Sequence, residues 1–139
     1  MRFQVKLDDN AIMPTKAHTV DAGFDIYARN GGIVPKHGSL CFNTGVHINI
    51  PKGFVGFLKS KSGLNVNAGI TSEGVIDSGY TGAIVVKLYN NSGIDYYVAR
   101  GEKISQIVFL PIPNVTLKQV DSFKITTERG DKGFGSSGR

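Results

Sequence analysis

Turn-forming residues recur throughout this chain at short intervals, and this spacing constrains the fold more than any other feature. Glycine, proline and asparagine separate runs of strand length, and the sequence contains 18 glycines in 139 residues, which implies many turns. Apolar Val46, Ile48 and Ile50 alternate with polar residues, a pattern typical of a strand with one buried face. No long window keeps a helical apolar period, and only residues 62–67 suit a short helical turn. We therefore predict an all-β fold, a distorted jelly roll or β-sandwich barrel.

The length of the chain is sufficient for one domain with a single core. We expect residues 1–127 to form this β domain. The last segment, residues 128–139, is rich in glycine and cannot bury enough apolar surface to fold by itself. We predict a flexible C-terminal arm there, and the alternative is an ordinary frayed terminus.

Cysteine content and hydropathy suggest where the protein works. Cys41 is the only cysteine in the sequence, so no intrachain disulfide and no cysteine-rich zinc site can form. Residues 1–10 alternate apolar and polar side chains and lack the apolar core of a secretion signal. The longest apolar stretch, residues 104–113, is interrupted by polar residues and is too short to span a bilayer. We expect a cytoplasmic protein without membrane association.

The charge balance favours an anionic partner. A formal net charge of +5 suits either nucleic acid or a nucleotide. Basic residues do not form consecutive blocks, which indicates a compact phosphate site or dispersed solubilising charges rather than a nucleic-acid groove. A nucleic-acid-binding β-barrel would also interleave basic and aromatic residues along its strands, and this sequence does not. The basic residues that stand beside glycine, serine or glutamate are Lys59, Lys61, Arg100, Lys103, Arg129 and Lys132.

The segment Gly74–Gly82 places a carboxylate and an aromatic ring in one short turn. Apolar residues lead into it and residues 83–88 form a second apolar run, so we expect a hairpin-like bend flanked by Asp77 and Tyr80. Such a bend suits the floor of a small-molecule pocket. The alternative is a purely structural turn in which Asp77 caps its own backbone.

Five segments, taken in order, resemble the trimeric dUTP diphosphatase (dUTPase) family over nearly the whole chain. Each segment alone is a weak signal, but their order and joint presence are specific. The resemblance implies a homotrimer with active sites shared between subunits. The segments are Asp21–Ala28, Pro51–Gly56 with Lys61–Leu64, Gly74–Gly82, Gly101–Ile107 and Arg129–Gly138.

The resemblance assigns roles within the third segment. Asp77 would be the general base for a water that attacks the α-phosphorus of dUTP. Tyr80 would pack against the deoxyribose and exclude a 2′-hydroxyl. Backbone groups around Thr71, Gly74 and Ile76 would read uracil, and a mismatched base would leave their buried polar atoms unpaired.

The other segments are assigned to the triphosphate, the metal and closure of the site. Asp25 would hold Mg²⁺ through a water, and the alternative is a strand-end residue that satisfies turn backbone. Phe134 would stack on uracil when the C-terminal arm closes over the site of a neighbouring subunit. The residues expected to bind phosphate or to belong to the closing arm are Lys61, Ser62, Gly63, Gln106, Arg129, Gly135 and Ser136.

Two departures from the family pattern and two rival functions qualify this interpretation. Lys61 stands where the family usually has arginine, which replaces a bidentate fork by a point charge. Ser78-Gly79 stands where an acidic residue is common. A dCTP deaminase would need a glutamate near Lys87, which makes deamination the weaker alternative. A nucleotide-responsive regulatory module that binds another protein is the other alternative. The expected activity converts dUTP to dUMP and pyrophosphate, which limits uracil in DNA and supplies dUMP for dTTP synthesis.

Overall fold

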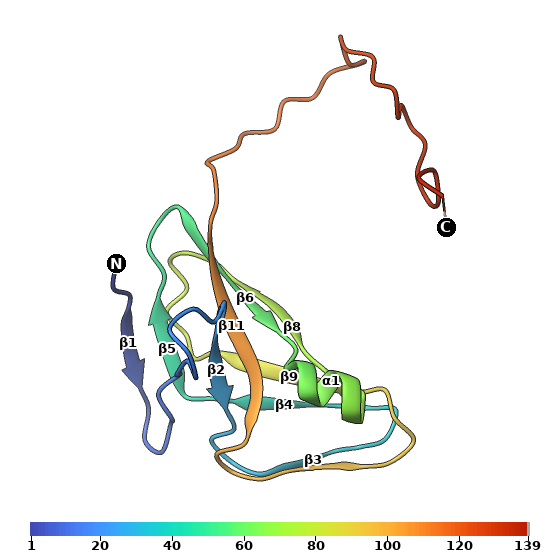
Figure 1. Cartoon of the computed structure of the whole chain (residues 1–139). Coiled ribbons are helices and arrows are strands. Elements are labelled where there is room, and N and C mark those ends of the chain that lie inside the picture. Colours follow the sequence, from blue (N-terminus) through green and yellow to red (C-terminus); the bar gives the residue numbers. More distant parts are fainter. Residues whose placement is uncertain (139) are drawn as a thin grey trace.

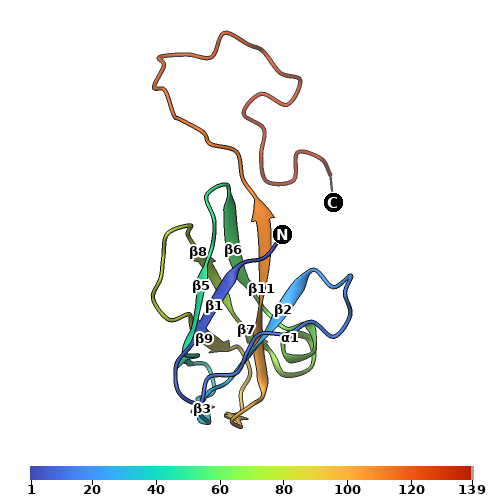
Figure 2. The same cartoon turned by 90° about the vertical axis from the view of Figure 1, so that its left-hand side faces the viewer.

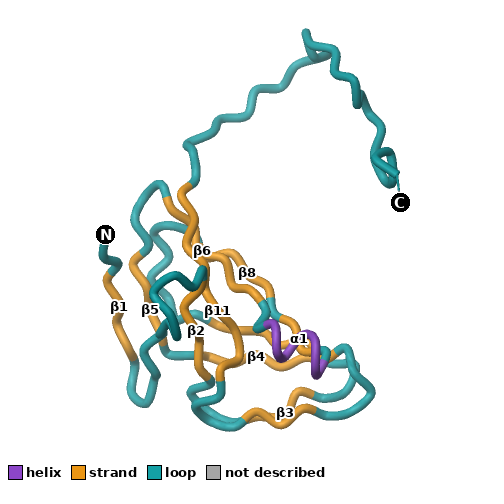
Figure 3. Tube along the Cα trace, viewed as in Figure 1, coloured by secondary structure: helices purple, strands orange, loops and turns teal. Residues whose placement is uncertain are grey.

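The computed structural model describes residues 1–138, and nearly all of its regular secondary structure is β-strand (Figure 1). One short helix interrupts the strands near the middle of the chain (Figure 3). The predicted all-β fold is therefore confirmed, and so is the short helix, which extends one residue beyond the predicted turn. The elements are β1 (Gln4–Leu7), β2 (Gly23–Tyr27), β3 (Gly32–Val34), β4 (Ser39–Asn43), β5 (Val46–Asn49), β6 (Phe54–Lys59), α1 (Ser62–Ala68), β7 (Ile70–Thr71), β8 (Glu73–Ile76), β9 (Val85–Asn90), β10 (Tyr96–Val98) and β11 (Lys103–Pro111).

The strands pair antiparallel in four groups. The larger sheet has the order β2-β11-β6-β8, and a second sheet has the order β4-β9-β7. β1 pairs with β5 and β3 pairs with β10. The core lies between the two larger sheets, because Ile107 and Leu58 from one and Val86 and Leu88 from the other are buried in the same apolar cluster. This arrangement is a two-layered β-sandwich.

The pattern of burial follows the alternation in the sequence. On β9 the side chains of Val86 and Leu88 are buried, whereas Val85, Lys87 and Tyr89 point outward. Period-two alternation sends successive side chains to opposite faces of a sheet, so one face joins the core. Each fully buried aliphatic side chain stabilises the fold by about 1.5–3 kcal/mol relative to leaving it exposed.

The bend after β8 does not join two paired strands, so the expected hairpin is not formed. β8 pairs with β6 in the larger sheet, whereas β9 pairs with β4 and β7 in the other sheet. The reason lies at Ile84, which is buried and whose backbone exchanges hydrogen bonds with Thr44 and Val46. These bonds draw the outgoing chain to β5. Residues 77–84, called here the Asp77 turn, therefore cross from one sheet to the other.

The last strand ends at Pro111, and the Ile112 N–H still donates to the carbonyl oxygen of Gly53 at 2.8 Å. Residues 115–138 then run away from the body (Figures 1 and 2). Residues 112–138 contain neither helix nor strand, and their side chains are exposed. The division into a domain of residues 1–127 and an arm of residues 128–139 stays a prediction. In the described part of the chain, α1 with its seven residues is the only helix, and it has neither the length nor the apolar character to cross a membrane.

Candidate active site

A buried carboxylate with two lysines forms the most strongly charged feature near α1. Asp25 on β2 is only 5% exposed. One carboxylate oxygen accepts a hydrogen bond from Lys61, and the other pairs with the Lys103 Nζ at 2.8 Å. Burial by itself would raise the pKa of Asp25, but the hydrogen bonds from Lys103 and Lys61 outweigh it and hold the pKa below its ordinary value. These three residues, called here the cationic cluster, therefore carry a net positive charge at neutral pH.

The start of α1 lies directly beside this cluster. Lys61 is the N-cap residue, in an extended conformation, and Ser62 and Gly63 form the first turn. The first N–H groups of a helix lack acceptors within the helix. A Cβ added at Gly63 would meet nothing within 4 Å, so the backbone at this point is open to an approaching group. Backbone donors next to two ammonium groups suit a phosphate.

Gln106 lies on β11 between β2 and β6, opposite Asp25 on one side and Lys59 on the other. Its Nε2 donates a hydrogen bond to the carbonyl oxygen of Ser60 at 3.0 Å. Gly23 makes room for this side chain, because a Cβ there would lie 2.5 Å from the Gln106 Oε1. Register and the missing Cβ together place Gln106 beside the chain that leads into α1.

Buried hydroxyl groups hold the end of β6 in place. The Ser72 and Ser105 hydroxyls lie 2.8 Å apart, and Ser105 donates to the carbonyl oxygen of Lys59 at 3.0 Å. The Ser60 hydroxyl accepts from the Ser72 N–H at 3.0 Å. Sequence reasoning did not assign a role to these serines or to Lys103. Ser105 and Lys103 lie within the fourth segment, but their partners come from other strands and the local sequence does not identify them.

The Asp77 turn places Asp77 and Tyr80 at one cavity. This cavity has a volume of about 210 Å³ and is lined by Val75, Ile76, Asp77, Tyr80, Ala83 and Val85. The Tyr80 hydroxyl donates to the carbonyl oxygen of Ala83 at 3.0 Å, and the Tyr80 N–H donates to that of Asp77 at 3.2 Å. The ring lies against Gly82, where an added Cβ would come within 2.4 Å of the hydroxyl oxygen. The turn is therefore closed on itself around the tyrosine.

The cationic cluster and the Asp77 turn lie at opposite ends of the β6–β8 pair. Ile76 is paired with Gly56 and Glu73 with Lys59. At roughly 3.3 Å per residue, about 10 Å separates Gly56 from Lys59, and Lys61 lies still farther along. Gly74 lies between, on β8 opposite Leu58, whereas Thr71 lies on β7, which pairs with β9 in the second sheet. One chain therefore does not bring Asp77 to the start of α1.

The predicted residues of the C-terminal arm form a third, separate group. Phe134 is fully exposed, with a backbone φ of 38°. The Arg129 Nε donates to the carbonyl oxygen of Lys132 at 2.9 Å, and the Ser136 hydroxyl donates to the same oxygen at 3.4 Å. Gly135 adopts a positive φ of 91°. In the described chain the side-chain hydrogen bonds of Arg129 and Ser136 therefore stay within the arm and do not reach the cationic cluster or the Asp77 turn.

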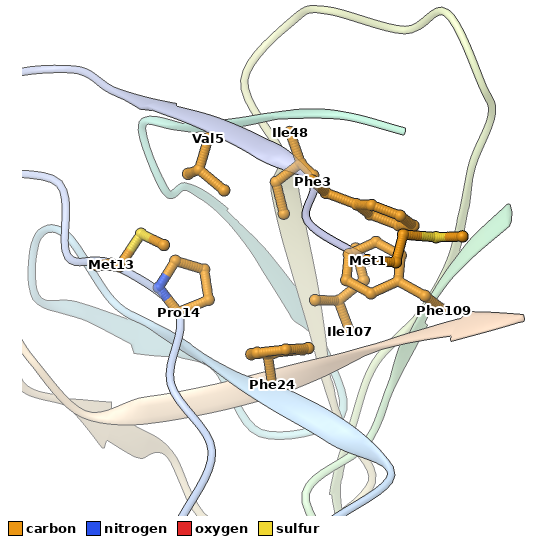
Figure 4. Close-up of a pocket in the computed structure, with 9 residues that line it drawn as sticks. All are labelled: Met1, Phe3, Val5, Met13, Pro14, Phe24, Ile48, Ile107 and Phe109. Carbon is orange, nitrogen blue, oxygen red and sulfur yellow. The ribbon is translucent and has the colours of Figure 1, made fainter. Parts of the chain in front are cut away.

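A second cavity, between the β1–β5 pair and the larger sheet, contains none of the predicted site residues (Figure 4). Its volume is about 270 Å³, and all of its lining side chains are apolar. Phe3 and Phe109 pack edge to face there, with ring centroids 4.9 Å apart. Because it offers no side chain that could bind phosphate or activate water, we do not assign it to catalysis. The lining residues are Met1, Phe3, Val5, Met13, Pro14, Phe24, Ile48, Ile107 and Phe109.

The donor set around Asp25 fits a divalent cation only through water. Both carboxylate oxygens already hold ammonium groups, so direct binding would displace Lys61 or Lys103. Within residues 1–138 no three His, Cys, Asp or Glu side chains gather to form a metal cage. Mg²⁺ keeps several waters and is commonly held by substrate phosphates with one or two carboxylates. The free lone pairs of Asp25 are compatible with that mode.

The β-sandwich, the cationic cluster at a helix start and the carboxylate–tyrosine cavity define a class: all-β proteins that act on small phosphorylated ligands. The family model described as dUTPase matches residues 9–138. The chain belongs to the dUTPase family.

Individual relatives match over nearly the full length. The deoxyuridine 5′-triphosphate nucleotidohydrolase of Candida albicans is 38% identical over 129 residues, which are 91% of this chain and 81% of that protein. The solved dUTPase of Staphylococcus bacteriophage 80alpha with dUPNHPP has a TM-score of 0.94 and 33% identity, covering 99% of both chains. A mutant dUTPase of Staphylococcus aureus phage phi11 has a TM-score of 0.82 and 29% identity, covering 90% of this chain and 100% of that one. Its structure concerns the coordination of a structural Mg(II) ion.

Proposed function

We propose that this chain hydrolyses dUTP to dUMP and pyrophosphate and thereby limits uracil in DNA and supplies dUMP for dTTP synthesis. As a dUTPase-family member it is a deoxyuridine 5′-triphosphate nucleotidohydrolase. The observation that carries the proposal for this chain is the cavity shared by Asp77 and Tyr80. A base and a sugar-sized aromatic wall at one cavity are what selective hydrolysis of a deoxynucleotide requires.

In the proposed reaction Asp77 accepts a proton from a water whose oxygen forms a bond to the α-phosphorus. The bond from that phosphorus to the oxygen bridging toward the β-phosphate breaks, and its electron pair leaves with pyrophosphate. Tyr80 excludes a ribose 2′-hydroxyl, and the backbone of Thr71, Gly74 and Ile76 reads uracil. The hydrogen bond from Tyr80 to Ala83 supports this assignment, because it holds the ring in one orientation.

The triphosphate would bind at the start of α1. Ser62 and Gly63 offer donors beside the positive charge of Lys61 and Lys103, and Gln106 adds an amide. Fixed donors of this kind stabilise the charge that develops on the leaving group. Mg²⁺, when bound to the phosphates, neutralises part of their charge, and Asp25 would hold one of its waters.

A homotrimer explains how these separate groups meet one substrate. Asp77 must reach the α-phosphate while Ser62 binds the adjoining phosphates. Within one chain, however, Asp77 and Ser62 lie at opposite ends of the β6–β8 pair. We propose that the Asp77 turn of one subunit faces the α1 start of a second subunit. Arg129, Phe134, Gly135 and Ser136 would close the same site.

Mixed oligomers test this arrangement. Asp77→Asn removes the base, and Ser62→Glu places a carboxylate where phosphate must bind, so each variant alone should be inactive. If sites combine two subunits, reassembly of the two variants together should restore part of the activity. A mixture that stays inactive, although mass measurement shows mixed trimers, would contradict the shared site.

The primary test is pyrophosphate release with magnesium from dUTP, dCTP, dTTP and UTP at equal concentrations. We expect turnover of dUTP alone. Turnover of dCTP with ammonia release would instead favour deamination. That reaction needs a glutamate near position 87, where this chain has Lys87 on the outer face of β9.

A regulatory module that responds to nucleotide is the second candidate. The structure of the phage 80alpha relative is described in terms of dUTPases that control the transfer of virulence genes by a G protein-like mechanism. For this chain, binding of dUTP without hydrolysis of any of the four nucleotides would favour such a module over an enzyme.

A further inference from the structure

A histidine outside the five segments contacts the Asp77 turn. His47 lies on β5, and its side chain is only 17% exposed. Its Nδ1 lies 2.8 Å from the carbonyl oxygen of Thr81, the residue that follows Tyr80, and its Nε2 lies 3.0 Å from the Asp8 Oδ1. We propose that protonated His47 is a positioning residue that holds the Asp77 turn in its working shape. This inference rests on the proposed dUTP hydrolysis.

Both neighbours of the imidazole are hydrogen-bond acceptors. A neutral imidazole has one N–H and one lone pair, so one of its nitrogens would face an oxygen without a proton between them. The imidazolium donates to both. The carbonyl of Thr81 and the carboxylate of Asp8 accordingly raise the pKa of His47. Protonation of His47 is therefore coupled to the hydrogen bond that links β5 to the Asp77 turn.

The surrounding charges act through Asp8 and across the β1–β5 pair. The second carboxylate oxygen of Asp8 faces the Arg29 guanidinium at 3.8 Å. Lys6 lies directly opposite His47 in the strand register, and its charge opposes the imidazolium. The hydrogen bond from His47 helps to hold the pKa of Asp8 below its ordinary value, so the carboxylate stays ionised where His47 titrates.

The link is important because the interior of the turn has few other attachments. Tyr80 bonds within the turn, to Ala83 and Asp77, and Ile84 is bound at its far end by Thr44 and Val46. Among the described residues, the contact from His47 to Thr81 is the hydrogen bond that ties residues 77–83 to another element. Its loss would leave Tyr80 and Asp77 held only from the two ends of the turn.

The kinetic test compares pH profiles of kcat/KM for dUTP. The wild type should decline on the alkaline side with a midpoint above 6.5, the ordinary pKa of histidine. His47→Gln should lose this limb and about tenfold in kcat/KM, with increased relative use of UTP. Asp8→Asn keeps the imidazole but removes its carboxylate, so the midpoint should move to lower pH. His18→Gln changes an exposed histidine and should reproduce the wild-type profile.

A spectroscopic measurement separates this inference from the proposed function. NMR titration of the ligand-free protein should show the amide signals of Thr81, Gly82 and Ala83 following the His47 imidazole with one midpoint, which Asp8→Asn lowers. Absence of dUTP hydrolysis would refute the proposed function and leave this coupling to be judged by NMR. Amide signals that do not change with the His47 titration would overturn the positioning role. An unchanged alkaline limb in the kcat/KM profile of His47→Gln would overturn it as well.

Discussion

The Asp77 side chain is exposed, and no side chain of the described residues donates a hydrogen bond to its carboxylate. A carboxylate with this freedom can face a water, and the general-base role depends on its negative charge. Asp77→Asn keeps the shape but cannot accept the proton, so we expect kcat to fall by at least about a hundredfold with nearly unchanged affinity. Steady-state turnover and calorimetric binding of a non-hydrolysable dUTP analogue measure the two quantities. Retained turnover in the variant would exclude Asp77 as the base.

Asp25 links β2 to both lysines and should contribute to stability as well as to phosphate binding. Its pKa is lowered in the folded state, so its contribution is present above the ordinary value of 3.8 and is lost as the pH falls through the folded-state pKa. Asp25→Asn should reduce the free energy of unfolding at pH 7 by about 1–2 kcal/mol, less than for a fully buried pair because Lys61 and Lys103 remain partly solvated.

Urea denaturation at fixed protein concentration, from pH 7 down to 3, measures this effect. The difference between wild type and Asp25→Asn should shrink toward the acid end. Glu73→Gln, which removes the exposed ion pair of Glu73 with Lys59, is the matched control and should change stability by less than about 1 kcal/mol. Equal effects of the two substitutions would mean that the burial of Asp25 adds nothing.

At the scale of elements, the shape of the Asp77 turn depends on Gly82. A Cβ at this position would lie 2.4 Å from the Tyr80 hydroxyl oxygen and 2.5 Å from the ring carbon that bears it. Gly82→Ala must therefore displace the ring and break its hydrogen bond to Ala83. We expect kcat/KM for dUTP to fall about tenfold and the preference for dUTP over UTP to weaken. Ser78→Ala, on the same turn, should leave the preference unchanged, and parallel loss in both variants would point to a general loosening.

At the scale of the whole molecule, the last twelve residues should be needed for turnover but not for the stability of the body. Phe134 is fully exposed in the described chain and contributes no packing to the body. Truncation after Thr127 removes Arg129 and Phe134, so turnover of dUTP should fall strongly while the melting temperature stays unchanged. Phe134→Leu in the full-length chain isolates the ring, whose stacking on uracil is worth about 1–3 kcal/mol. A truncated protein with full turnover would show that the arm is only a frayed terminus.

Features that depend on neighbouring residues could be predicted from the sequence. Alternation identified the buried face of β5, and the spacing of Asp77 and Tyr80 placed both at one bend, because the four residues of a tight turn remain close in any fold. The short helix that begins at Ser62 could also be predicted, because it depends on residues that are neighbours in the chain. The hairpin was wrong because adjacency along the chain suggested pairing, whereas Ile84 is drawn to Thr44 and Val46 by backbone hydrogen bonds.

Contacts between groups that are distant in the chain could be seen only in the folded protein. The pairing of Lys103 with Asp25, the fit of Gln106 against Gly23 and the contact of His47 with Thr81 join positions far apart in the chain. Each depends on strand order and register, and a shift by one residue would turn these side chains to the opposite face. The all-β class and the chemistry of each segment could be read from the sequence, since both follow from local periodicity and residue type. The charge state of the cationic cluster and the support of the Asp77 turn arise only when the strands are packed, because both depend on burial and on partners from other strands.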